Sequence, residues 1–188
     1  MDLPYITLIS FGYFDADFLR NVAEAVKKEF LLDVNIKEGH LDLSEFYDPT
    51  RRQYSGVKLI NEIENVFSSE SSKTIGIFNV DIFIPILTYI FGQAFLNGRT
   101  GIASNFRLNN ERYGIKMDGG LVLERLIKEV IHELGHTFGL IHCHIPSCVM
   151  RSSTYVEDID QKSMHLCLNC RNEYNKMINK SGIGPDAN

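Results

Sequence analysis

Several features are missing from this 188-residue sequence, and each absence narrows the class of protein. The first residues, Met1 to Tyr5, lack the basic stretch and the apolar run of a signal peptide, so we expect a cytoplasmic protein. A membrane span is not expected, because Asp81, Pro85 and Gly92 interrupt the most apolar region. Lys and Arg are not in excess, and the formal net charge of -5 argues against a nucleic-acid partner.

Cysteine is also scarce, and its placement is informative. All four cysteines lie within 28 positions near the C-terminus: Cys143, Cys148, Cys167 and Cys170. In a reducing compartment such a cluster is more typical of a metal site than of disulfides, and the C-x4-C and C-x2-C pairs are close to zinc-ribbon spacings. Thiolates suit a closed, tetrahedral structural zinc site. Two disulfides remain the alternative.

The composition, with 44% hydrophobic and 23% charged residues, predicts one globular domain, or one domain with a small appendage. Hydrophobic periodicity predicts this order of elements: strand 5–10, helix 15–30, strand 34–36, helix 59–67 and strand 74–80. Strands that alternate with helices imply a parallel sheet with right-handed crossovers. The polar stretch from His40 through Asp48 to Arg52 predicts a long surface connection.

The second half of the chain predicts a hairpin followed by a helix. Residues 91–96 and 102–107 look like two strands around a glycine-rich turn, at the edge of the sheet. A helix should begin near Asp118 and continue to Gly139, where the chain becomes irregular. A short helix is expected over residues 159–170, before a polar tail whose last residues, 181–188, are loose.

The predicted helix ends in HELGHTFGLIH over residues 132–142, which has the form HExxHxxGxxH. His132 and His136 project from nearly the same side of a helix, so both can bind one metal ion. Glu133 lies beside them, within reach of a water on that metal. Gly139 can take the left-handed conformation that turns the chain sharply and returns His142 as a third ligand.

This pattern matches the chemistry of a hydrolytic zinc site. Three neutral imidazoles leave zinc one open position for water, whose pKa falls toward about 7. Glu133 would take the proton from that water and pass it to the leaving amine, which predicts peptide-bond hydrolysis. The alternative is that His132 and His136 are ordinary helical residues and that Glu133 is a solvated or salt-bridged side chain.

The motif continues into a longer signature. Cys143 follows directly, then Cys148 and Met150, and after sixteen intervening residues the pair Cys167 and Cys170. This combination resembles the archaemetzincins, a family of metzincin-clan zinc peptidases, although the spacing after Met150 is about one residue shorter than in the family pattern. A loop can absorb that difference. The segment Tyr47 to Tyr54 is similar to the family as well, although less specifically.

The resemblance implies an α/β metzincin-like (zincin) fold: a mixed, mostly parallel five-stranded twisted sheet with an antiparallel edge strand, for which residues 91–96 are the candidate. An extended peptide could pair with that edge. It implies an N-terminal α/β subdomain, residues 1–139, that ends in the active-site helix. Residues 140–188 would form a small irregular C-terminal subdomain that zinc stabilises and that carries the third His ligand and the Met-turn.

The resemblance also implies site residues and cofactors. Two Zn2+ ions per chain are expected, one catalytic and one structural. The residues concerned are His132, His136 and His142 for the catalytic zinc, Glu133 as general base and acid, Met150 in the Met-turn, and Cys143, Cys148, Cys167 and Cys170 for the structural zinc. Tyr155 and His144 are weaker candidates near the metals.

The leading hypothesis is therefore a monomeric zinc metallopeptidase that acts on a peptide or protein substrate. One alternative is a metzincin-fold zinc protein that is catalytically weak or inactive and serves as a binding or scaffold module. The intact Glu133 counts against it, because a degenerate site usually loses its base first. Another alternative, a nucleic-acid-binding zinc module, conflicts with the acidic balance.

Overall fold

The order of helices and strands follows the sequence-based prediction. The computed structural model describes residues 5–114, 116 and 118–180, so the predicted loose segment 181–188 and residues 1–4 lie outside the described residues. The elements are, in chain order, β1 (Tyr5–Phe11), α1 (Ala16–Phe30), β2 (Val34–Gly39), η1 (Leu43–Phe46), β3 (Tyr47–Asp48), β4 (Gln53–Ser55), α2 (Gly56–Glu62), η2 (Ile63–Phe67), β5 (Ser72–Phe78), β6 (Ile82–Phe83), β7 (Gly92–Ala94), β8 (Thr100–Ser104), η3 (Phe106–Leu108), η4 (Asn110–Tyr113), α3 (Gly119–Thr137), α4 (Val156–Gln161) and α5 (Leu168–Lys180).

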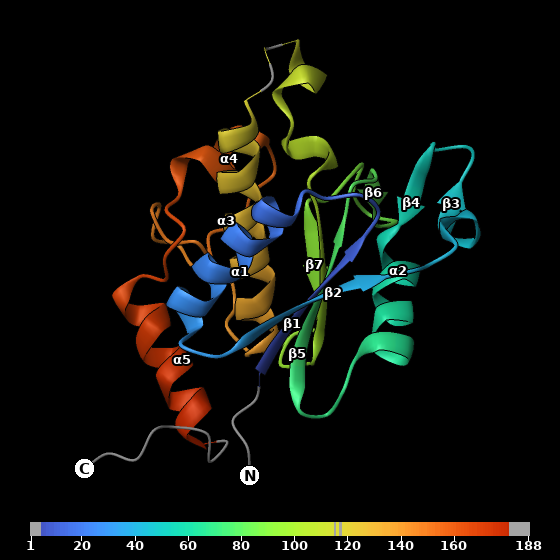
Figure 1. Cartoon of the computed structure of the whole chain (residues 1–188). Coiled ribbons are helices and arrows are strands. Elements are labelled where there is room, and N and C mark those ends of the chain that lie inside the picture. The colour runs from blue at the N-terminus through green and yellow to red at the C-terminus, as the bar shows by residue number, and fades with distance from the viewer. Residues whose placement is uncertain (1–4, 115, 117, 181–188) are drawn as a thin grey trace.

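The main sheet has five strands in the order β2-β1-β5-β8-β7. β1 pairs in parallel with β2 and β5, and β5 pairs in parallel with β8. β7 is antiparallel to β8 and ends the sheet. The predicted fold class is confirmed, because the mostly parallel sheet with one antiparallel edge strand lies between helices on both sides (Figure 1).

Each central strand contributes alternate side chains to two cores. Ile6 and Leu8 of β1 face α1 and α3, in the larger core, whereas Ile9 and Phe11 face α2 in the smaller one. This is the period of two that an extended strand imposes. Because both faces of the sheet are covered, six of the seven residues of β1 are buried, as in strands of buried parallel sheets. The sheet thus forms a fixed platform under α3.

The prediction of a long surface connection after β2 was wrong in part. Residues 47–55 form a β-hairpin whose strand β4 pairs in parallel with β6, so that a second, three-stranded sheet results. Gln53 is buried, and its Nε2 donates a hydrogen bond to the carbonyl of Thr88 at 3.0 Å. These strands are only two or three residues long, which is too short to produce an alternating sequence pattern.

The predicted helix over residues 159–170 was also wrong in its bounds. α4 ends at Gln161 and α5 begins at Leu168, so an irregular segment separates two helices. The expected polar tail is helical as far as Lys180, because Tyr174 is buried against α1 and donates a hydrogen bond to the Phe30 carbonyl. Over the described part of the chain, no helix combines the length and hydropathy that crossing a membrane requires.

Candidate active site and metal centres

Helix α3 positions the first two candidate ligands. Asp118 caps its N-terminus by accepting a hydrogen bond from the Leu121 N–H at 3.1 Å. The helix then crosses the sheet and contacts β8 and β7, so its last turns lie buried above the edge of the sheet. His132 and His136 fall one turn apart on the face that carries Glu133. A capped helix of 19 residues on a rigid sheet therefore fixes the spacing of both imidazoles.

The chain turns after α3, as the glycine in the motif predicts. Gly139 has a φ of +96°, a conformation that residues with a Cβ rarely adopt. The turn brings His142 back to α3, and ligand nitrogens of His132, His136 and His142 lie within 4.8 Å of one another. The structure thus brings together all three histidines that the sequence predicts as metal ligands.

The protonation of two imidazoles follows from their hydrogen bonds. Nδ1 of His132 lies 2.8 Å from the Val149 carbonyl oxygen, and Nδ1 of His136 lies 2.7 Å from the Leu140 carbonyl oxygen. A carbonyl only accepts, so each Nδ1 carries a proton. Burial lowers the pKa of both rings, which favours neutral imidazoles with unprotonated Nε2 atoms.

These two Nε2 atoms lie only 3.1 Å apart. Two unprotonated nitrogens cannot hydrogen-bond to each other, and their lone pairs repel at this distance unless a cation lies between them. A tetrahedral zinc with Zn–N distances of about 2.05 Å separates its nitrogen ligands by about 3.3 Å. Because the observed separation is close to that value, the three histidines fit a zinc ion.

Glu133 lies beside the histidines and is almost completely buried. Burial raises the pKa of its carboxyl well above the usual range, and the negative charge of Glu129 raises this pKa further. Across from it lies Gly92 of β7, where a Cβ would come within 2.6 Å of Glu133 Oε1 and 2.7 Å of its Cγ. The carboxyl is therefore held in a slot between α3 and the edge strand.

This slot makes Gly92→Ala a sensitive test of where the Glu133 carboxyl must lie. The added methyl group would also come within 2.8 Å of the Ile102 carbonyl, so the strand cannot move away and Glu133 must move instead. We expect peptide hydrolysis to fall by roughly 100-fold, as small misplacements of reacting groups do, with unchanged metal content. Rates and metal analysis test this, with Gly119→Ala as the control because a Cβ there meets nothing within 4 Å. An active Gly92→Ala variant would contradict the proposed position of Glu133.

Met150, for which the sequence predicts a Met-turn, packs against α3 at Gly135, the residue before His136. It is fully buried, and a Cβ at Gly135 of α3 would collide with its Sδ and Cε atoms. Its carbonyl accepts a hydrogen bond from the Cys143 N–H at 3.0 Å. The segment at Met150 therefore connects the chain just after His142 to helix α3.

The four cysteines form a second compact cluster. Their sulfur atoms all lie within 4.8 Å of one another. The Cys143–Cys167 and Cys148–Cys170 sulfurs are each 3.8 Å apart, far longer than the S–S bond of about 2.05 Å in a disulfide. A tetrahedral zinc with Zn–S distances of about 2.3 Å separates its sulfurs by about 3.8 Å. The cluster fits a zinc ion, with one pair of cysteines before α4 and the other pair at the start of α5.

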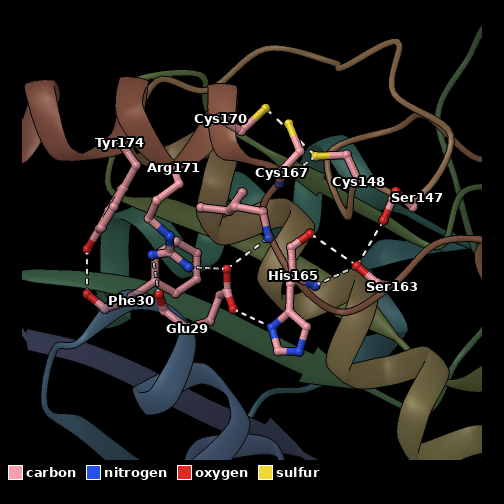
Figure 2. A network of polar contacts seen from close by, with 11 residues as sticks. Glu29, Phe30, Ser147, Cys148, Ser163, His165, Cys167, Cys170, Arg171 and Tyr174 are labelled. Atoms are coloured by element: carbon pink, nitrogen blue, oxygen red, sulfur yellow. Dashed lines mark hydrogen bonds and ion pairs between the residues drawn. The ribbon is translucent and has the colours of Figure 1, made fainter.

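A buried carboxylate on α1 holds the segment between these pairs (Figure 2). Glu29 accepts hydrogen bonds from the Leu166 N–H at 2.9 Å and from His165 Nδ1 at 2.8 Å, and it forms an ion pair with Arg171 of α5. Ser163 adds a hydrogen bond to the Ser147 carbonyl. His165 is thus part of the network that attaches the cysteine cluster to the α/β layers.

Glu29→Gln should destabilise the fold by about 2–3 kcal/mol, because it removes the negative charge opposite the Arg171 guanidinium inside a buried network. Denaturant-induced unfolding of the zinc-loaded protein measures this loss. Glu24→Gln, which changes an exposed carboxylate on the same helix, is the matched control and should have almost no effect. Equal stability of the two variants would show that the Glu29 network contributes nothing.

A cavity of about 450 Å³ opens beside the histidine cluster. Its walls come from β7 with the loop before it, from α3, and from the segment after Met150. Tyr155, one of the weaker candidates, lines this cavity but is 63% exposed, and His144 is exposed. Glu129 and Lys162, which form an ion pair in the cavity wall, were not predicted as site residues. They are 33 residues apart in the chain, and no sequence pattern indicates that they lie close together in the fold.

Comparisons with known proteins agree with this geometry. A sequence profile described as peptidase family M54 matches residues 10–176. An archaemetzincin from Pyrococcus horikoshii is 36% identical over 172 residues, which cover 88% of this chain and 90% of that protein. A crystal structure of archaemetzincin from Methanopyrus kandleri matches with a TM-score of 0.81 and 30% identity, over 93% of this chain and 96% of that one. A zinc-dependent peptidase from Methanocorpusculum labreanum matches with a TM-score of 0.81 and 27% identity, over 90% and 100% of the two chains.

Proposed function

The chain belongs to peptidase family M54, the archaemetzincins, and is therefore a zinc-dependent peptidase. We propose that its zinc is held by His132, His136 and His142, and that Glu133 activates the attacking water beside it. The observation that carries this proposal is the 3.1 Å approach of the two Nε2 atoms whose rings are oriented by carbonyl groups. Backbone oxygens behind ligating imidazoles are the usual device that fixes the tautomer at a zinc site.

Zinc bound there would polarise the scissile carbonyl and lower the pKa of a coordinated water toward about 7. The chain supplies the remaining functions. Glu133, whose pKa burial raises, is a stronger base than an exposed carboxylate and accepts the proton of the attacking water. The same carboxyl then donates that proton to the leaving amine. His132 and His136 stay neutral through the reaction, because burial lowers the pKa of both rings. The backbone carbonyls keep the single proton of each ring on Nδ1.

The free edge of β7 supplies a place for the substrate backbone. β7 is the last strand of the main sheet, and Gly92 brings its backbone against Glu133. An extended peptide that pairs with this edge would run past Glu133 and the three histidines. Main-chain hydrogen bonds would give affinity without sequence selectivity, so selectivity must come from side-chain pockets beside the edge.

We also propose that a second zinc, held by the four cysteines, is structural. Four thiolates leave no open coordination position for water. Burial raises the pKa of the Cys148 and Cys170 thiols, so the thiolate state depends on a bound cation. This zinc would hold residues 140–188 together as a small subdomain next to the α/β subdomain, residues 1–139.

Digestion of a peptide library by the zinc-loaded protein tests the function. Cleavage products that appear with the wild type and are absent with Glu133→Ala would support it and would give the position of the cut. If the zinc-loaded wild type cuts no peptide in the library, the proposed peptidase mechanism fails and a binding role on the same fold becomes the better explanation.

A further inference from the structure

The loop between β6 and β7 forms one wall of the cavity beside the histidines. Ile84, Leu87, Thr88 and Tyr89 of this loop line the cavity. Residues 85–88, the tip of the loop, are exposed, and Leu87 leaves half of its surface to solvent. A half-exposed leucine in a cavity wall gains free energy when an apolar group covers it. The tip is therefore a surface that an apolar side chain of a substrate can contact.

The base of this loop is held by contacts that do not involve the tip. The Ile90 N–H donates a hydrogen bond to the Ile82 carbonyl at 3.0 Å, which joins the two ends of the loop. The Arg107 guanidinium lies 4.1 Å from the centre of the Tyr89 ring and forms an ion pair with Asp81. The base thus has a fixed position from which the tip projects.

Arg51, in the hairpin of residues 47–55, holds the tip from outside the loop. Its Nη1 donates a hydrogen bond to the Leu87 carbonyl at 3.2 Å, and its Nη2 donates a longer one to the Pro85 carbonyl at 3.5 Å. The same guanidinium lies 4.5 Å from the centre of the Phe83 ring, which fixes its direction. One arginine side chain thus holds two carbonyl groups of the tip.

Gln53 of the same hairpin holds a third carbonyl. Its side chain is buried, and its Nε2 donates a hydrogen bond to the Thr88 carbonyl at 3.0 Å. Within the described part of the chain, the tip has one further hydrogen bond, from the Leu87 N–H to the Ile84 carbonyl at 3.1 Å. The position of the tip therefore depends mainly on two side chains of the hairpin.

The hairpin acts on the cavity only from behind. It contains the segment Tyr47 to Tyr54, the second stretch that resembles the family, and no residue of this segment lines the cavity or belongs to either metal cluster. All of these residues are described. A segment that does not reach the cavity can influence a substrate only through the loop that it holds.

We propose that Arg51 and Gln53 are positioning residues for substrate binding, which hold the loop tip so that Leu87 contacts an apolar side chain of the substrate beside the metal centre. They act through backbone carbonyls of the tip and do not touch the substrate. A wall that is ordered before binding loses less conformational entropy when the substrate binds. The proposal rests on the proposed function, because the cavity binds a substrate only if the metal centre beside it hydrolyses peptides.

Two peptidyl hydroxamates test the tip by binding instead of turnover. They share one backbone and one zinc-binding group, and the residue next to that group is leucine in one and glycine in the other. Calorimetry with the zinc-loaded wild type should show about tenfold tighter binding of the leucine compound, the effect of covering one apolar side chain. Equal binding of the two compounds would overturn the proposal.

Arg51→Met and Gln53→Leu each remove hydrogen bonds from the tip, so the ratio of leucine-compound to glycine-compound affinity should fall toward one. The matched control is Arg52→Met, which removes the same charge from the same hairpin. The Arg52 side chain is exposed and makes no hydrogen bond, ion pair or ring contact with any described residue, so the control should keep the wild-type ratio. A wild-type ratio in both test variants would overturn the proposal. Should Gln53→Leu, a change at a buried side chain, not fold, the exposed Arg51 decides.

Leu87→Ala separates a positioning role from a general loosening of the fold. This change leaves the carbonyl groups of the tip in place and should by itself lower the ratio toward one. Arg51→Met added to Leu87→Ala should lower the ratio no further, because the contact that Arg51 positions is already absent. If the two changes are fully additive, Arg51 does not act through Leu87 and the proposal is overturned.

Acetohydroxamate, which has no side chain, distinguishes failure of this proposal from failure of the proposed function. If Arg51→Met weakens acetohydroxamate as much as the leucine compound, the arginine is only structural and the proposal is overturned. If acetohydroxamate does not bind the zinc-loaded wild type, the proposed metal centre fails and this proposal fails with it. If acetohydroxamate binds while the leucine and glycine compounds bind equally, only the proposal about the tip fails.

Discussion

Glu133→Gln is expected to lower peptide hydrolysis by about 10²–10⁴-fold, the range that a positioned general base usually contributes. Glutamine keeps the size of the side chain, so it should fill the slot beside Gly92 without moving β7. Glutamine accepts no proton at neutral pH, so proton transfer from the attacking water to residue 133 should fail. The measurement is the rate at which the zinc-loaded protein cleaves a peptide identified in the library digestion.

The control separates loss of the base from loss of the site. Glu133→Gln should bind as much zinc as the wild type, because Glu133 is not one of the proposed zinc ligands. Glu157→Gln changes an exposed carboxylate of α4 and should keep full activity. A Glu133→Gln variant that retains more than about one tenth of the wild-type rate would exclude Glu133 as the general base.

The grouping of the three histidines beside Glu133 could be predicted from the sequence because its geometry is local. His132, Glu133 and His136 lie on one helix, whose repeat fixes their directions, and Gly139 sets the turn that returns His142. The parallel pairing of β1, β2 and β5 was predictable for a similar reason, since strands that alternate with helices favour a parallel sheet. The antiparallel edge strand was predicted from residues 91–96, and β7 occupies Gly92–Ala94.

Other parts could not be predicted because distant segments determine them. Glu29 contacts Leu166, which is 137 residues away, and nothing near position 29 distinguishes this glutamate from exposed ones on the same helix. The burial and pairing of Glu129 and Lys162 could not be predicted either, because a buried charge is recognised only from its surroundings. The helix α5 was missed because its sequence is mostly polar, and the contact of its Tyr174 with the distant helix α1 cannot be read from the sequence.

Loss of metal from the cysteine cluster should affect the histidine cluster more than the reverse, because residues 148–150 connect the two clusters. Cys148 precedes Val149, whose carbonyl orients His132, and Met150, which lies under Gly135. Loss of the metal at the cysteines would release this segment from the catalytic side. Loss of the metal at the histidines leaves the sulfur positions supported by the network around Glu29 (Figure 2).

Cys167→Ser should therefore remove one zinc, lower the free energy of unfolding by about 3–5 kcal/mol, and weaken binding of the catalytic zinc by roughly 10–100-fold, as misoriented ligand partners do. His136→Ala should remove only the catalytic zinc and change stability much less. Native mass spectrometry counts the metals in each variant, and denaturant-induced unfolding gives the stabilities. If Cys167→Ser keeps two zinc ions and wild-type stability, the cysteines hold no structural metal. If instead it loses one zinc and catalytic-zinc affinity is unchanged, the segment from Cys148 to Met150 does not couple the two sites.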